Sequence, residues 1–322
     1  DWAVDLLRRS LEAGRMAHAY LMSGPSQVGK TTLALALAKA LNCTYADPPC
    51  GHCPSCLQIE HGTHPDVQLI VGDGARESIK IEQIRVLQRE AVLSPYEGGY
   101  RVFVLRRIDR ASVEAANSLL KTLEEPPPHV VLVLTALDPE ALPATIVSRC
   151  QRLDLRPAAC DIVEQALRQK GIQSPTAELL SRLSGGRVGW ALRACEDEAI
   201  LDSRQQGLDL LVGLLSKDRL GRLEYAAKAS RDQATVRQNI RLWTSWWRDL
   251  LLLCNQSEAG IVNIDRLDEM RQLVTQLTLT QAVAGLHALQ AAADQLDANV
   301  NPRLAVEGLL LNLPGSNPLL RN

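Results

Sequence analysis

The chain has 322 residues, of which 46% are hydrophobic and 22% are charged. This is ordinary globular composition, and it excludes a disordered, collagen-like or low-complexity chain. The 35 Lys and Arg residues are balanced by 37 Asp and Glu residues, giving a net charge of −2, so no overall basic excess attracts nucleic acid. Aromatic residues make up 3% of the chain, which argues against a stacking platform for single strands.

No apolar run approaches the roughly 20 residues of a membrane span. The first residues also lack the basic and apolar segments of a signal peptide. We therefore expect a cytoplasmic protein. In that compartment clustered cysteines predict metal ligands and scattered cysteines predict buried thiols, and four of the eight cysteines are clustered.

The first half of the chain alternates predicted helices and strands. In chain order we expect a helix at 2–17, a strand at 18–22, a helix at 33–41, a strand at 66–71, a helix at 79–93, a strand at 101–106, a helix at 112–125, a strand at 130–135, a helix at 139–147 and a strand at 151–155. Such alternation predicts a mostly parallel sheet with helices on both faces.

The second half of the chain carries no strand signals. Residues 158–196 predict three short helices, and residues 200–311 predict long helices with leucine at helical spacing. The predicted plan is an α/β domain at 1–155, a small helical domain at 156–199 and a larger helical domain at 200–322.

Residues 24–31 match the P-loop pattern G-x-x-x-x-G-K-[ST], after a predicted strand and before a predicted helix. Glycines let backbone N–H groups curl around phosphates, and the helix start adds its positive dipole end. The lysine would reach the β- and γ-phosphates of ATP, and the first threonine hydroxyl would bind Mg²⁺. The residues expected at the nucleotide are Gly24, Gly29, Lys30, Thr31 and Thr32. The alternative is a glycine turn without a ligand.

A P-loop that hydrolyses ATP also needs acidic residues at the end of the next core strand. Here that strand ends in Arg106 and Arg107, and two cations cannot hold Mg²⁺ or polarise water. Asp109 follows in the next turn, and we expect it to pair with a nearby arginine rather than to replace the missing carboxylates. The sequence therefore predicts a site that can bind a nucleotide but cleaves it poorly, so that ATPase activity of the chain itself is absent or weak.

Four cysteines, Cys43, Cys50, Cys53 and Cys56, lie within fourteen residues. Each C-x-x-C step lets two sulfurs face one ion, and four sulfurs complete a tetrahedron without an open position. We therefore expect a structural zinc site in a loop at 43–56. A redox dithiol and chance clustering are the alternatives.

Four strings identify the chain as a member of the bacterial clamp-loader subunits of the AAA+ class. They lie at 18–21, 40–43, 116–127 and 148–150, and the last two read Ala-Asn-Ser-Leu-Leu-Lys-Thr-Leu-Glu-Glu-Pro-Pro and Ser-Arg-Cys. The resemblance spans residues 1 to about 200 and continues more weakly to the end. It implies a P-loop AAA+ domain, a helical lid and an all-α collar that assembles into a five-subunit ring.

Within this family the chain resembles the delta-prime subunits more than the gamma/tau subunits. The gamma/tau motor keeps an acidic pair where this chain has Arg106 and Arg107, and the segments 64–66 and 79–85 are also similar to delta-prime. The resemblance implies a DNA polymerase III subunit that acts with gamma/tau and delta to load the sliding clamp on primed DNA. A gamma/tau-like motor with its own hydrolysis is the alternative, and a zinc-containing nucleic-acid adaptor is a third hypothesis.

The resemblance also assigns a role to Arg149 in the Ser-Arg-Cys string: an arginine finger offered to ATP on a neighbouring gamma/tau subunit. Without the family, an arginine at a helix end is more often a solvated charge. Gly189 stands where the motor has a sensing arginine, with Arg187 on a different helix face. Thr135 matches a polar sensor position, and here we expect it to satisfy a buried backbone group.

Trp243, Trp246 and Trp247 lie at helical spacing in the last predicted domain. We expect them in its hydrophobic core. An interface anchor for a partner helix is the alternative.

Overall fold

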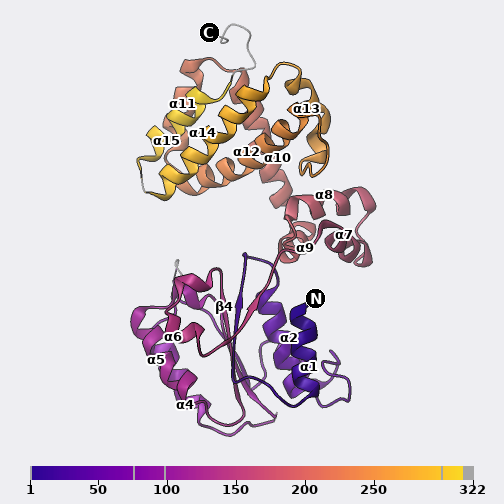
Figure 1. Ribbon diagram of the computed structural model, residues 1–322, viewed down its shortest axis with the longest axis vertical. Helices are drawn as coiled ribbons and strands as arrows, with labels where there is room; N and C mark the ends of the chain where they lie inside the picture. Colours follow the sequence, from indigo (N-terminus) through magenta and orange to yellow (C-terminus); the bar gives the residue numbers. More distant parts are fainter. Residues whose placement is uncertain (1, 75–76, 98, 299, 315–322) are drawn as a thin grey trace. The chain divides into compact units, whose positions relative to one another are not determined.

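The computed structural model describes residues 2–74, 77–97, 99–298 and 300–314 (Figure 1). The chain divides into two compact units. Unit 1 comprises Asp1–Ala158 with Arg187–Trp190, and unit 2 comprises Ala159–Gly186 with Ala191–Asn322.

Unit 1 is built on a five-stranded parallel sheet with the strand order β2-β3-β4-β1-β5. The strands are β1 (Ala19–Ser23), β2 (Val67–Ile70), β3 (Arg101–Leu105), β4 (Val130–Ala136) and β5 (Gln151–Asp154). Every residue of β1 and β4 is buried, as expected for central strands of a parallel sheet covered on both faces. The predicted α/β fold is therefore confirmed.

Helices cover both faces of this sheet. They are α1 (Trp2–Glu12), α2 (Lys30–Asn42), α3 (Pro54–Glu60), α4 (Ile81–Ala91), α5 (Val113–Glu124) and α6 (Ala144–Val147), with the short 3₁₀ helices η1 (Ile108–Arg110) and η2 (Pro139–Ala141). In Figure 1, α1 and α2 lie on one side of the sheet, and α4, α5 and α6 lie on the other.

Alternate residues of the central strands supply the two cores of unit 1, because successive side chains of a strand point to opposite faces. On β4, Val131 and Val133 pack in the core beneath α1 and α2. Leu132 and Leu134 pack in the core beneath α4, α5 and α6. The sheet is thereby fixed in register, and its carboxyl edge, where the P-loop lies, is held by both helical layers.

Two predicted helices differ most from the structure. The first ends at Glu12 rather than at residue 17, because Gly14 adopts a positive φ of 63° that ends the helix. The helix expected at 139–147 is broken into η2 and α6. Pro143 is the reason, since the residue before a proline avoids the helical region, and Leu142 is indeed extended.

Unit 2 is helical throughout its described residues. Its helices are α7 (Cys160–Gln169), α8 (Ser174–Ser184), α9 (Val188–Glu196, which begins in unit 1), α10 (Glu198–Ser216), α11 (Arg219–Ala229), α12 (Gln233–Cys254), η3 (Ile264–Arg266), α13 (Leu267–Val274), α14 (Leu279–Asp297) and α15 (Pro302–Asn312). Across the described part of the chain, none of the helices has the length and apolarity needed to cross a membrane.

The three tryptophans of α12 are buried in the core of unit 2, so the core prediction is confirmed. Two of them also satisfy their indole N–H groups. Trp243 donates to the carbonyl of Gly207 on α10, and Trp247 donates to the carbonyl of Ala282 on α14, both at 2.8 Å. The indole of Trp247 lies so close to α14 that a Cβ on Gly285 would come within 2.3 Å of the ring.

We expect Gly285→Ala to lower the free energy of unfolding by about 1–3 kcal/mol or more, because the added methyl overpacks the indole. Gly213→Ala on α10 is the matched control. Its added Cβ meets no atom within 4 Å, so it should leave stability unchanged or raise it by up to about 1 kcal/mol. Urea unfolding followed by tryptophan fluorescence compares the two variants. Equal stabilities would contradict the close packing of α14 on Trp247.

Candidate nucleotide and metal sites

The P-loop connects β1 to α2 at the carboxyl edge of the sheet. Gly24 has a φ of 135° and Gly29 a φ of 103°, conformations that favour glycine. A Cβ on Gly24 would lie 2.2 Å from the carbonyl oxygen of Leu155, so the backbone leaves no room for a side chain. No side chain of the described residues caps the start of α2, and its first N–H groups are therefore available to an anion.

Lys30, the first residue of α2, lies over this loop and is 8% exposed. Its ammonium donates to the carbonyl oxygens of Gly24 and Pro25, both at 2.6 Å. Burial, together with the charge of Arg107 and against the opposing charge of Asp109, lowers the pKa of Lys30 to about 8. A phosphate would supply the negative charge that two neutral carbonyls lack.

The two arginines after β3 point to different partners. Arg106 pairs with Glu77, with 2.8 Å between Nη2 and Oε1. Arg107 donates from Nε to both carboxylate oxygens of Asp109, at 3.1 Å, and from Nη2 at 2.8 Å. The predicted pairing of Asp109 with a neighbouring arginine is confirmed. Both members of this pair follow β3 at the carboxyl edge of the sheet, where the P-loop also lies, and their charges have opposite effects on the pKa of Lys30.

Thr135, near the end of β4, fixes the backbone of Arg107. Its hydroxyl accepts the Arg107 N–H at 3.1 Å, and the threonine itself is buried. This confirms the expectation that Thr135 satisfies a buried backbone group. Arg107 adopts a φ of 59°, which is uncommon for a residue with a side chain.

The segment that follows Gly185 and Gly186 contacts the P-loop through its backbone. The N–H of Gly189 donates to the carbonyl of Gln27 at 2.9 Å, and a Cβ on Gly189 would lie 2.9 Å from that same oxygen. The guanidinium of Arg187 lies over the ring of Trp190, 5.8 Å from its centroid. Gly189 therefore allows a close backbone contact with the P-loop.

The four clustered cysteines converge on one point. Their Sγ atoms all lie within 4.8 Å of one another, and the Cys43–Cys53 and Cys50–Cys56 pairs are 4.0 Å apart. The expectation that all four lie in a loop is wrong for Cys56, which lies in α3, while Cys53 caps that helix. Pro54 explains the difference, because proline favours the first position of a helix.

The geometry of the cluster fits a tetrahedral metal. Zinc–sulfur bonds of about 2.3 Å place the sulfurs about 3.8 Å apart, close to the observed spacing, whereas a disulfide needs about 2 Å. The N–H groups of Cys50, Cys53 and Cys56 donate to the preceding cysteine sulfurs at 3.3–3.5 Å. Several hydrogen bonds, of which the one from the Cys56 N–H is the largest cause, lower the pKa of Cys53 to about 6, whereas burial raises the pKa of Cys56 to about 12. The four cysteines are thus placed to hold one metal ion.

Arg149 follows α6 and precedes β5 at the surface of unit 1, with a side chain that is 35% exposed. It forms an ion pair with Glu124, the last residue of α5, at 2.7 Å, and donates to the carbonyl of Thr145 at 2.9 Å. The sequence did not predict Glu124 as the partner of Arg149, although Glu124 lies in the segment 116–127 that carries the family resemblance. Nothing in the local pattern indicates which distant arginine a glutamate meets.

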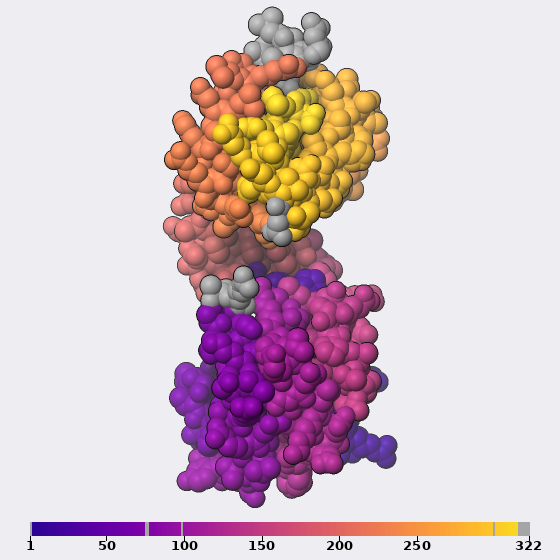
Figure 2. Space-filling view, turned by 90° about the vertical axis from the view of Figure 1, so that its left-hand side faces the viewer, coloured from indigo at the N-terminus to yellow at the C-terminus, as the bar shows by residue number. Residues whose placement is uncertain are grey.

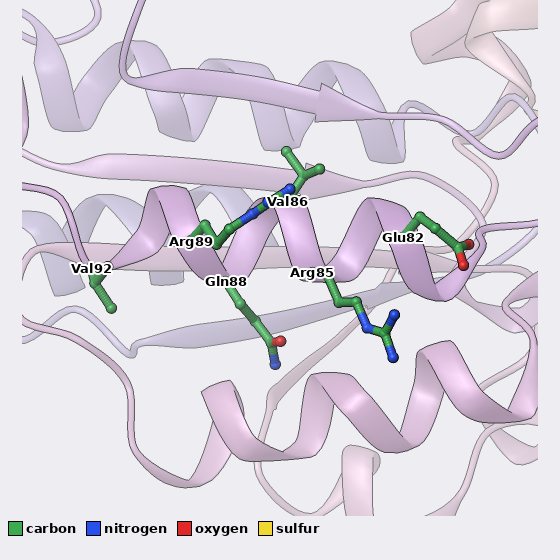
Figure 3. Close-up of a pocket in the computed structure, with 6 residues that line it drawn as sticks. All are labelled: Glu82, Arg85, Val86, Gln88, Arg89 and Val92. Atoms are coloured by element: carbon green, nitrogen blue, oxygen red, sulfur yellow. The ribbon is translucent and has the colours of Figure 1, made fainter.

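A surface hollow of about 570 Å³ lies on α4, away from all of these sites. Figure 2 shows the surface of unit 1 over α4 and α5, and Figure 3 shows the lining residues. They are Glu82, Arg85, Val86, Gln88, Arg89 and Val92. The Gln88 amide points toward α5 and donates to the carbonyl of Ser118 at 2.7 Å. None of the sequence-predicted site residues lines this hollow.

Comparisons with known proteins identify the family to which the chain belongs. The family model described as "DNA polymerase III, delta subunit" matches residues 1–159. The delta' subunit of DNA polymerase III from Bacillus subtilis is 30% identical over 314 residues, covering 96% of this chain and 94% of that protein. The chain belongs to the DNA polymerase III clamp-loader family.

Tau subunits of DNA polymerase III match over a smaller share of their own length. The tau subunit from Salmonella typhimurium is 38% identical over 301 residues, covering 90% of this chain but 44% of that protein. Among solved structures, a gamma subunit-related protein from Thermotoga maritima is 21% identical, with a TM-score of 0.44 over 96% of this chain and 97% of that chain.

We expect the purified protein to carry about one zinc per chain, because four convergent thiolates form a closed structural site. Cys50→Ser should lose the metal and lower the thermal midpoint. Cys160→Ser is the matched control, since Cys160 is exposed and lies outside the cluster. Elemental analysis of protein prepared without chelators is the measurement, and metal-free wild-type protein would refute the site.

Proposed function

We propose that this chain is a delta-prime-like subunit of the DNA polymerase III clamp loader, which helps to load the sliding clamp on primed DNA. The observation that carries the proposal is the end of β3, where Arg106 and Arg107 replace the carboxylates of a hydrolytic site. A subunit with an intact P-loop and no carboxylate for the metal is suited to serve its neighbours rather than to drive the cycle itself. The match to delta' along nearly the whole chain supports the same assignment.

Arg149 is the residue through which the subunit would act on a neighbour. In the proposed assembly, its guanidinium is offered to ATP bound by an adjacent gamma/tau subunit. A planar guanidinium stabilises charge on the transferring phosphoryl group, an effect of about 10³–10⁵ in rate in related systems. The ion pair with Glu124 is exposed, and such pairs contribute about 0–1 kcal/mol. A γ-phosphate can therefore compete for this arginine.

The remaining parts of the chain would serve assembly. We assign residues 1–155 as the nucleotide-binding domain, 156–199 as the lid and 200–322 as the collar of a five-subunit ring with gamma/tau and delta. The cysteine cluster would hold a structural zinc within the first domain. Because the net charge is −2, contact with primed DNA is assigned to the whole complex rather than to attraction by this subunit alone.

A gamma/tau-like motor is the second candidate. The complete P-loop favours it, as does the 38% identity to a tau subunit. Such a motor would need a carboxylate for Mg²⁺, and Asp109 is the nearest acidic side chain after β3. Because Arg107 donates hydrogen bonds to both carboxylate oxygens of Asp109, we rank the motor as the second candidate.

Arg149→Ala tests the proposed function in a clamp loader reconstituted from all of its subunits. We expect normal assembly, because the truncated side chain lies at the surface and leaves no core cavity. ATP hydrolysis stimulated by clamp and DNA should fall partially, since only the site facing this subunit loses its finger, and clamp loading should fall more. Arg149→Lys should not restore the rate fully, because a point charge lacks the planar fork.

Arg152→Ala is the matched control, because it removes an exposed arginine three residues along the chain that pairs with Asp154. It should leave hydrolysis and loading near the wild-type values. Unchanged hydrolysis and loading in fully assembled Arg149→Ala complex would refute the finger role. A complex that fails to assemble with Arg149→Ala would contradict the expected normal assembly and would make Arg149 a residue on which the interface depends.

A further inference from the structure

We propose that the P-loop of this chain binds the polyphosphate of a nucleoside triphosphate without Mg²⁺, and that Arg107 stands in place of the metal ion. This inference rests on the nucleotide binding assigned above, and it specifies the form of the ligand.

The residues beside the P-loop do not fit a magnesium ion. In P-loop proteins that ion is held by the loop hydroxyl, here Thr31, and by an acidic residue at the end of a core strand. Arg106 and Arg107 occupy that strand end, and both oxygens of Asp109 accept hydrogen bonds from Arg107. The Asp109 side chain is 9% exposed, so its carboxylate is closed to a hydrated cation. A divalent ion would also be repelled by the guanidinium.

The structure instead holds Arg107 rigidly at this position. Its backbone N–H is bound by Thr135, its φ is 59°, and its guanidinium is fixed by Asp109. A residue other than glycine persists in the left-handed region where its surroundings maintain that conformation. Here two anchors from different elements, Thr135 on β4 and Asp109 on η1, hold its backbone and its guanidinium, whereas Arg106 pairs with Glu77.

One nitrogen of the Arg107 guanidinium could bind a ligand. Its bonds to Asp109 use Nε and Nη2, and Nη1 has no hydrogen-bond partner among the described residues. The Arg107 side chain is 19% exposed, so this nitrogen can be reached from outside. Guanidinium groups bind phosphate oxygens with strong charge-assisted hydrogen bonds. Together with the ammonium of Lys30 and the N–H groups of α2, Nη1 completes a set of donors for a phosphate chain.

The charge balance favours the metal-free ligand. Free ATP carries two more negative charges than its magnesium complex, and the site offers Lys30 and Arg107 against the single carboxylate of Asp109. A magnesium ion on the β- and γ-phosphates would occupy the oxygens that Arg107 is placed to bind. The ligand class is therefore a metal-free nucleoside triphosphate. With neither a metal nor a free carboxylate beside it, the bound nucleotide would be retained rather than cleaved.

The test is equilibrium binding of ATP to the full-length chain by calorimetry, in EDTA and again in excess Mg²⁺. We expect binding in EDTA, and a loss of apparent affinity of about tenfold or more in Mg²⁺, because the site must compete with the metal for the phosphates. Arg107→Ala should weaken binding in EDTA by about tenfold and should remove the inhibition by Mg²⁺.

Arg106→Ala is the matched control. It removes the same charge one residue earlier, from a side chain paired with Glu77 at the surface. It should keep wild-type affinity in both buffers, and thermal melting checks that both variants are folded. Binding that is tighter in Mg²⁺ than in EDTA, equal effects of the two variants, or no binding of ATP in either buffer would overturn the proposal. The reconstitution with Arg149→Ala does not depend on this outcome, so either proposal can fail while the other stands.

Discussion

The ion pair between Arg107 and Asp109 determines the chemistry of the nucleotide site. It engages Asp109, the first acidic residue after β3, and the charge of Arg107 lowers the pKa of Lys30. Both effects arise because arginine, and not an acidic residue, stands at the end of β3. The P-loop has the glycine conformations of a phosphate-binding loop. In the function proposed above, the site binds a nucleotide without cleaving it.

The parallel sheet makes this arrangement possible. Because β4 lies between β3 and β1, the P-loop after β1, Thr135 on β4 and Arg107 after β3 meet at one carboxyl edge. The two cores on either face of the sheet hold these strands in register. Arg149 lies elsewhere, between α6 and β5, where it faces outward and pairs with Glu124. The proposed arginine finger and the proposed nucleotide site are therefore carried by different loops of the same sheet.

Sequence patterns predicted the features that depend on local order. The alternation of strands and helices gave the sheet, the P-loop spacing gave the position of Lys30, and the spacing of the cysteines gave a cluster whose sulfurs converge. They failed where the outcome depends on a single special residue, such as Pro143, which breaks a predicted helix. They also could not identify partners far apart in the chain. The pairing of Arg149 with Glu124 is decided by the packing of α6 against α5, and no periodicity records it.

The central claim of this account is that the chain serves a neighbouring site and does not hydrolyse ATP at its own P-loop. The most direct test is steady-state ATP hydrolysis by the isolated full-length chain in Mg²⁺, with Lys30→Ala as the background. The account predicts that the two proteins release phosphate at indistinguishable rates. Sustained turnover by the wild-type chain that Lys30→Ala abolishes would contradict it, and would identify the chain as a motor subunit.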